Sequence, residues 1–76
     1  MKIYILTCVR EDGELVFAWA FRTKADAQEN LKINFDARKH QFESETSLGY
    51  AHLKKNSAAL GDDYQAYIWK ITPATV

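Results

Sequence analysis

Residues 2–22 read KIYILTCVREDGELVFAWAFR, and this stretch decides the fold. Residues 2–10 and 15–22 are rich in β-branched and aromatic side chains and are too short for independent helices, so each run predicts a strand. Asp12-Gly13 between the two runs is a hairpin signal. We expect a two-residue type I′ turn there, with positive φ at both residues.

This register places Arg10 opposite Leu15 and gives the hairpin two mainly apolar faces. One face is expected to carry the pairs Cys8–Phe17, Leu6–Trp19 and Tyr4–Phe21. The other face is expected to carry Val9–Val16, Thr7–Ala18, Ile5–Ala20 and Ile3–Arg22. Both faces of the hairpin therefore need to be covered.

Residues 23–43 predict one amphipathic helix of about five turns. Thr23 is the expected N-cap, and Asp26 lies in the first turn, where the helix dipole favours a negative charge. The apolar residues Ala27, Leu31, Phe35 and Phe42 recur near i, i+4 and i+7 spacing. Residues 43–47 have poor helix propensity and are interpreted as a connector.

The remaining third of the chain is less regular. Residues 49–53 and 56–60 are compatible with two short strands or with irregular structure. Residues 64–71 predict a final strand that Pro73 is expected to stop. In that strand Tyr67, Trp69 and Ile71 share one side, and Ala66, Ile68 and Lys70 share the other.

The expected architecture is α+β, in a single small domain spanning residues 1–76. We expect a mostly antiparallel sheet of three to five strands, with one long amphipathic helix packed on one face. The order of elements is ββα followed by the remaining strands.

One helix, about 10–12 Å wide, covers only one face of such a sheet. The other face is left for residues 44–60, for a second copy of the protein or for a different partner. We favour the aromatic face beneath the helix, because Arg22 and Lys70 fall on the opposite side. Small residues such as Ala18 leave the reverse assignment open.

Large aromatic side chains that stay exposed are typical of interface hot spots. The candidate interface residues are Tyr4, Phe17, Trp19, Phe21, Tyr67 and Trp69.

Charge and cysteine content limit the environment and the partners. Ten Lys and Arg balance ten Asp and Glu, so no global field attracts nucleic acid or anionic lipid. Cys8 is the only cysteine, which excludes an internal disulfide and fits a reducing compartment. No apolar run approaches the ~20 residues that span a bilayer, and no secretion signal is evident. We expect a cytoplasmic protein without membrane association.

The sequence gives little sign of catalysis. Cys8 lies in mid-strand and is interpreted as a buried structural thiol. His40 and His52 with one cysteine lack the spacing of a zinc site, and Asp36 with His40 is interpreted as a solvated helix-surface pair. The three glycines are too scattered for a phosphate-binding loop. We expect no enzyme activity, no cofactor and no metal.

The first functional hypothesis is a small non-enzymatic protein–protein interaction module that self-associates through a sheet face as a homodimer. The first alternative is a small inhibitor or adaptor, of phage or mobile-element type, that binds a larger protein. It would use acidic and aromatic surface, with the hairpin tips supplying Glu11, Asp12, Glu14, Asp62 and Asp63.

The second alternative is a single-stranded nucleic-acid binder that stacks bases on Tyr4, Phe17, Trp19 and Tyr67. The neutral charge disfavours it, because basic clusters are confined to residues 38–40 and 54–55. The Asp-Gly hairpin, the charged helix and the closing Tyr67-x-Trp69-Lys70-Ile71 run are similar to those of many short bacterial or phage proteins. That similarity rests on no motif and implies no function.

Overall fold

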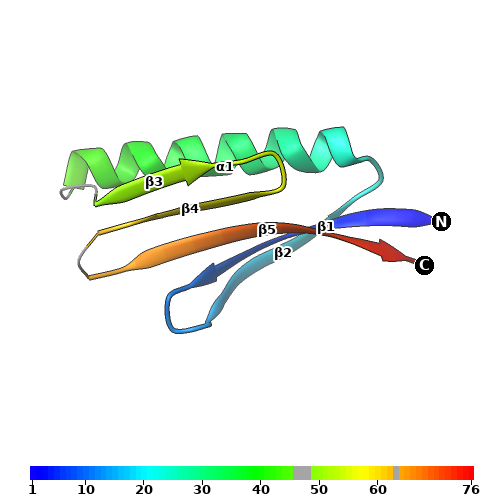
Figure 1. The fold of residues 1–76 in the computed structure, drawn as a ribbon, viewed down its shortest axis with the longest axis horizontal. Helices are drawn as coiled ribbons and strands as arrows, with labels where there is room; N and C mark the ends of the chain where they lie inside the picture. The colour runs from blue at the N-terminus through cyan, green and yellow to red at the C-terminus, as the bar shows by residue number, and fades with distance from the viewer. Residues whose placement is uncertain (46–48, 63) are drawn as a thin grey trace.

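The computed structural model describes residues 1–45, 49–62 and 64–76. Its elements are β1 (Lys2–Arg10), β2 (Leu15–Phe21), α1 (Lys24–Glu45), β3 (Tyr50–Leu53), β4 (Ser57–Gly61) and β5 (Ala66–Thr75). The strands form one antiparallel sheet in the order β2-β1-β5-β4-β3, and α1 runs along one side of it (Figure 1). The expected α+β fold with its ββα-then-β order is confirmed.

The hairpin between β1 and β2 forms, but its turn differs from the expected type. Gly13 has a φ of 87°, whereas Asp12 does not have positive φ, so the turn is not type I′. The N–H of Gly13 donates to the carbonyl of Arg10, and the N–H of Arg10 donates to the carbonyl of Glu14. These bonds describe a three-residue loop, in which a type I turn is followed by glycine in the left-handed region.

A β-bulge compensates for the longer loop. The loop pairs Val9 with Leu15, one residue away from the expected Arg10–Leu15 pair, and the expected Val9–Val16 pair is also wrong. Between Cys8 and Val9 the register shifts, with Val16 as the extra residue of β2. Beyond it the expected pairs Cys8–Phe17, Leu6–Trp19 and Tyr4–Phe21 are all present. The bulge therefore returns the strand to the register that its apolar pattern predicts.

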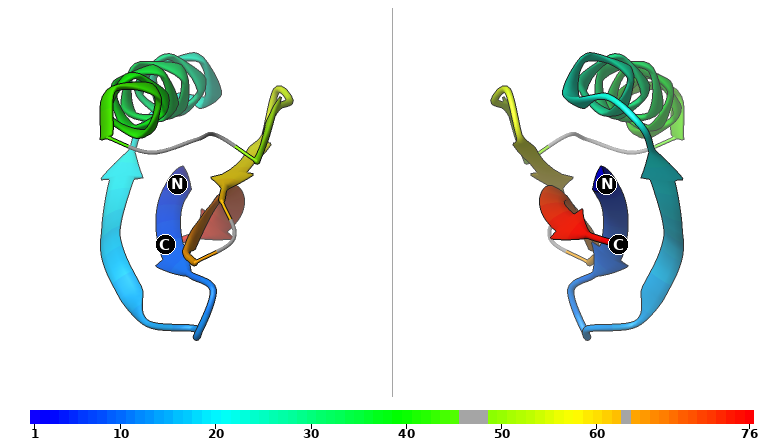
Figure 2. Two further views of the ribbon diagram at one scale, coloured as in Figure 1. Left: turned by 90° about the vertical axis from the view of Figure 1, so that its left-hand side faces the viewer. Right: turned by 90° about the vertical axis from the view of Figure 1, so that its right-hand side faces the viewer.

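The helix begins as expected and runs slightly further. The backbone N–H of Asp26 donates to Oγ1 of Thr23 at 3.1 Å, which caps the N-terminus. Ala27, Leu31, Phe35 and Phe42 are buried on the side that faces the sheet. Figure 2, which looks along the long axis of the molecule, shows α1 lying between the edge strands β2 and β3. The sheet therefore wraps partly around the helix, which contacts all five strands.

Residues 49–60 extend the sheet and do not cover its second face. Tyr50–Leu53 and Ser57–Gly61 pair with each other, and the latter strand also pairs with β5. The interpretation in which residues 44–60 cover the second face is therefore wrong for the part of this segment that the structure describes. Residues 46 and 47 of the expected connector lie outside the described residues, while α1 takes in residues 43–45.

The last strand is longer than expected, because Pro73 does not end it. β5 continues to Thr75, and Pro73 pairs with Tyr4 of β1. On its other side β5 pairs with β4 only as far as Lys70. A residue without an N–H is tolerated on such an unpaired strand edge.

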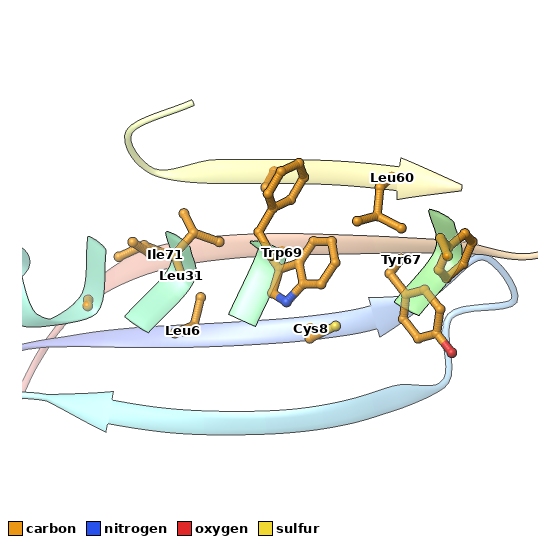
Figure 3. Close-up of a cluster of buried hydrophobic side chains, with 11 residues drawn as sticks. Leu6, Cys8, Leu31, Leu60, Tyr67, Trp69 and Ile71 are labelled. Carbon is orange, nitrogen blue, oxygen red and sulfur yellow. The ribbon is translucent and has the colours of Figure 1, made fainter. Parts of the chain in front are cut away.

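The core lies between α1 and the sheet. Leu6, Cys8, Leu60 and Trp69 are fully buried, and Figure 3 shows Trp69 in the middle of this cluster. Their strand positions all point to the helix side, so the aromatic face is the covered one, as favoured from the sequence. No helix in the described part of the chain is long and apolar enough to cross a membrane.

Candidate interaction surface

The six sequence-predicted interface residues lie together on the helix side of the sheet, on β1, β2 and β5. Trp69 is fully buried: its Nε1–H donates to Oδ1 of Asn34 at 3.0 Å, and Phe35 packs edge-on against its ring. Tyr67 is also buried, with the guanidinium of Arg38 lying 4.4 Å from its ring centroid. Both side chains therefore belong to the core and are not on the surface of the single chain.

The other four predicted residues lie at or near the edge of the core. Tyr4, Phe17 and Phe21 are partly buried against it. Trp19 stacks on Phe17 with ring centroids 4.0 Å apart and remains 45% exposed. Among the six, Trp19 offers the most accessible aromatic surface.

The surface that the helix leaves uncovered is formed by the alternate residues of the same strands. We call it the open face. Ile5 and Val9 on β1 are partly exposed there, and Ile68 at the centre of β5 is 46% exposed. The other strand residues on the open face include Ile3, Thr7, Leu15, Ala18, Ala20, Tyr50, His52, Ser57, Ala59, Lys70 and Thr72.

The open face carries very little charge. Lys70 is the one Lys, Arg, Asp or Glu that the described strands place on it. A hollow of about 420 Å³ lies beside Ile68 and is lined by His52, Lys54, Ser57, Ala58 and Ala59. Exposed apolar surface that is bordered by polar side chains, here His52, Lys54 and Ser57, is typical of a contact site.

β2 is the second exposed part of the sheet. It lies at the sheet edge, and Leu15, Val16 and Trp19 are each more than a third exposed. Its sequence contains no charged residue and no proline, the features that usually protect an edge strand from pairing. Residues 17–21 read Phe-Ala-Trp-Ala-Phe, which is the same in both directions. When two copies of such a strand pair antiparallel, each large side chain lies opposite a large one and each small side chain lies opposite a small one.

A basic groove lies between α1 and the end of β3, and it shares Lys54 with the hollow beside Ile68. It has a volume of about 710 Å³ and is lined by Lys24, Gln28 and Lys32 of α1 and by Leu53, Lys54 and Lys55 after β3. The sequence identified Lys54 and Lys55 as a cluster but missed the two helix lysines. Their spacing of eight residues, with Gln28 midway, puts them on one flank of a helix and was the available signal.

Cys8 is unsuited to nucleophilic chemistry. It is fully buried, and burial raises the pKa of its thiol to about 11, against a smaller lowering by the charge of Arg38. The thiol therefore stays protonated at neutral pH. Among residues 1–45, 49–62 and 64–76, no three His, Cys, Asp or Glu side chains are grouped so that they could hold a metal ion.

No family model matches the sequence, and no curated protein or solved structure matches it. What the chain does is therefore inferred from its own surface.

Proposed function

We propose that the protein is a small non-enzymatic interaction module that self-associates through the open face of its sheet. The observation that carries this proposal is the uncovered apolar face, with a single lysine among its strand side chains. The buried, protonated thiol of Cys8 supports a role without catalysis. A lone reduced cysteine also supports work in a reducing compartment such as the cytoplasm.

The size of the open face sets an upper limit on the area of a contact between two copies. One residue covers about 16 Å² of a sheet, so strands of nine, seven, four, five and ten residues present about 550 Å² on one face. Two such faces present about 1,100 Å² together, close to the lower limit for a specific interface, and the curvature of the sheet around α1 confines the contact to part of that area. Sheets that pack face to face in this way are common in β-sandwiches.

A second copy is the occupant that the chain itself favours. The open face is apolar on each copy, so two such faces cover each other's exposed apolar side chains, Ile68 among them. A net charge of zero removes the repulsion that would keep two copies apart.

Sedimentation of two matched variants tests the proposal. Ile68→Glu places a carboxylate at the centre of the open face, opposite Val9 and Ala59. Ile33→Glu makes the same change at a helix position that is 60% exposed. At micromolar concentration the wild type and Ile33→Glu are expected to sediment as dimers and Ile68→Glu as a monomer, because an unpaired charge in an apolar interface is costly.

A wild-type protein that is monomeric throughout this range would contradict self-association. Equal weakening by both substitutions would show that the open face is not the contact.

A further inference from the structure

We propose that the basic groove between α1 and the turn after β3 binds a compact polyphosphate chain. The groove lies between α1 and the turn after β3, and it adjoins the hollow beside Ile68 at one residue, Lys54, which lines both. The proposal rests on the grouping of lysines, on their lack of counter-charges and on the local structure that holds the groove together.

Four of the ten basic side chains gather around this one groove: Lys24, Lys32, Lys54 and Lys55. No acidic residue lines it. The ion pairs in the described part of the chain lie elsewhere and join Arg10 with Glu14 and Lys39 with Glu43. The groove therefore concentrates positive charge in a molecule that is neutral overall, and an anion placed there would offset the mutual repulsion of the lysines.

The two walls of the groove are fixed to each other. Nε2 of Gln28 donates to Oδ1 of Asn56 at 2.9 Å, which ties the helix to the turn between β3 and β4. The turn itself is closed by the N–H of Lys54, which donates to the carbonyl of Ser57. The lysine side chains can move, but their backbone positions are held on opposite sides of one groove.

The chemistry of the lining favours phosphate groups. Lysine ammonium groups bind phosphate as point charges, and a chain of three phosphates carries about four negative charges at neutral pH, one for each lysine. The volume of about 710 Å³ lies within the range of small-ligand sites. No aromatic ring lines the groove, so it offers no stacking surface for a base. These features favour a compact polyphosphate over a nucleic-acid strand.

Titration calorimetry with inorganic tripolyphosphate at low salt tests the site. The wild type is expected to bind, with affinity that falls as salt is added. A double variant, Lys54→Gln with Lys55→Gln, removes two charges from the groove and is expected to bind about tenfold more weakly or worse, since charge-assisted hydrogen bonds are lost. The matched control, Arg10→Gln with Lys39→Gln, removes two basic charges outside both the groove and the open face and is expected to bind like the wild type.

Amide chemical-shift mapping on the wild type gives a readout that needs no variant to fold. Tripolyphosphate is expected to move the amide signals of Gln28 and Leu53 more than those of β2. Absence of binding at low salt, equal weakening in the two double variants, or shifts spread evenly over the surface would each overturn the proposal. Tighter binding of an oligothymidylate than of tripolyphosphate would also overturn it and identify a nucleic-acid surface instead.

Discussion

At the scale of single residues, Trp69 is held in the core by a hydrogen bond as well as by packing. Its indole N–H has no access to solvent and donates to Oδ1 of Asn34 on the helix. Asn34→Ala leaves this buried donor unpaired, which should lower the free energy of unfolding by about 1–3 kcal/mol. Urea denaturation followed by tryptophan fluorescence measures the change.

The neighbouring substitution Ile33→Ala is the control, because its side chain is mostly exposed and should contribute little to stability. Trp69→Phe removes the indole N–H, so adding Asn34→Ala to it breaks no further hydrogen bond. The loss of stability in the Asn34→Ala, Trp69→Phe double variant should therefore be smaller than the sum of the losses in the two single variants. Strict additivity would show that the bond adds nothing to stability.

Cys8 gives the fold an alkaline limit. Burial raises the pKa of its thiol to about 11, from an ordinary value of 9.0. Between these values the unfolded chain has lost the thiol proton and the folded chain has kept it. The contribution of the Cys8 thiol to the free energy of unfolding is therefore fully present below pH 9 and is lost as the pH rises toward 11.

At pH 10.5 we expect this loss to reach about 2 kcal/mol in the wild type, relative to pH 8. Cys8→Ala lacks the thiol but shares every other titrating group, so unfolding of both proteins at both pH values isolates the effect. An equal pH response in the two proteins would contradict the assignment.

At the scale of elements, the apolar pattern of the sequence predicts which residues share a face but not how the turn is built. The pairs from Cys8–Phe17 to Tyr4–Phe21 follow from alternation and are correct. Asp12-Gly13 is compatible with both a two-residue and a three-residue loop, because Gly13 has positive φ in each. The register next to the turn was therefore wrong, and the bulge at Val16 restored it.

The helix was predictable from local sequence, whereas the short strands and the basic groove depend on contacts between distant residues. Thr23 and the apolar spacing of α1 are local signals, so the helix was predicted almost to its end. β3 and β4 consist of short runs with Gly, Ser and Asn near their ends, and their pairing with β5 decides their structure. The basic groove depends on the packing of α1 beside the turn after β3, which no local pattern reports.

β2 carries a prediction about the alternative arrangement, in which two copies meet along its edge and not through their open faces. A two-fold axis at Trp19 sets Trp19 opposite itself, Phe17 opposite Phe21 and Ala18 opposite Ala20. Opposed residues have Cβ atoms about 4.5–5.5 Å apart, close enough for a disulfide after small adjustment. In this edge arrangement, Trp19→Cys and the double variant Ala18→Cys with Ala20→Cys should form covalent dimers under mild oxidation, whereas Ala18→Cys alone should not. Face-to-face packing of the open faces predicts no cross-link at Trp19, which lies on the helix side of the sheet.

Non-reducing gel electrophoresis reads the result, and Ala25→Cys on the exposed side of the helix is the control. The native Cys8 does not interfere, because it is fully buried and protonated. Efficient cross-linking of Ala18→Cys alone would indicate a different register. Cross-linking of the Ala25→Cys control to the same extent would show that the dimers form by random collision.

At the scale of the whole molecule, self-association and folding should be coupled. A chain of 76 residues has a small core, and its sheet has one face that only another copy covers in the proposed assembly. Because association stabilises the folded state, the free energy of unfolding per dimer should rise by about 1.4 kcal/mol for each tenfold increase in protein concentration. Thermal unfolding over a hundredfold range of concentration should show a steady rise in Tm for the wild type.

Ile68→Glu should unfold at one temperature regardless of concentration, since its folded form gains nothing from a second copy. Ile33→Glu should keep the wild-type dependence, because it adds the same charge away from the open face. The difference between the two variants separates association from a general effect of charge on stability. A wild-type Tm that stays constant across this range would mean that the folded chain leaves its apolar face in water, and the open face would then lose its role as a contact between copies.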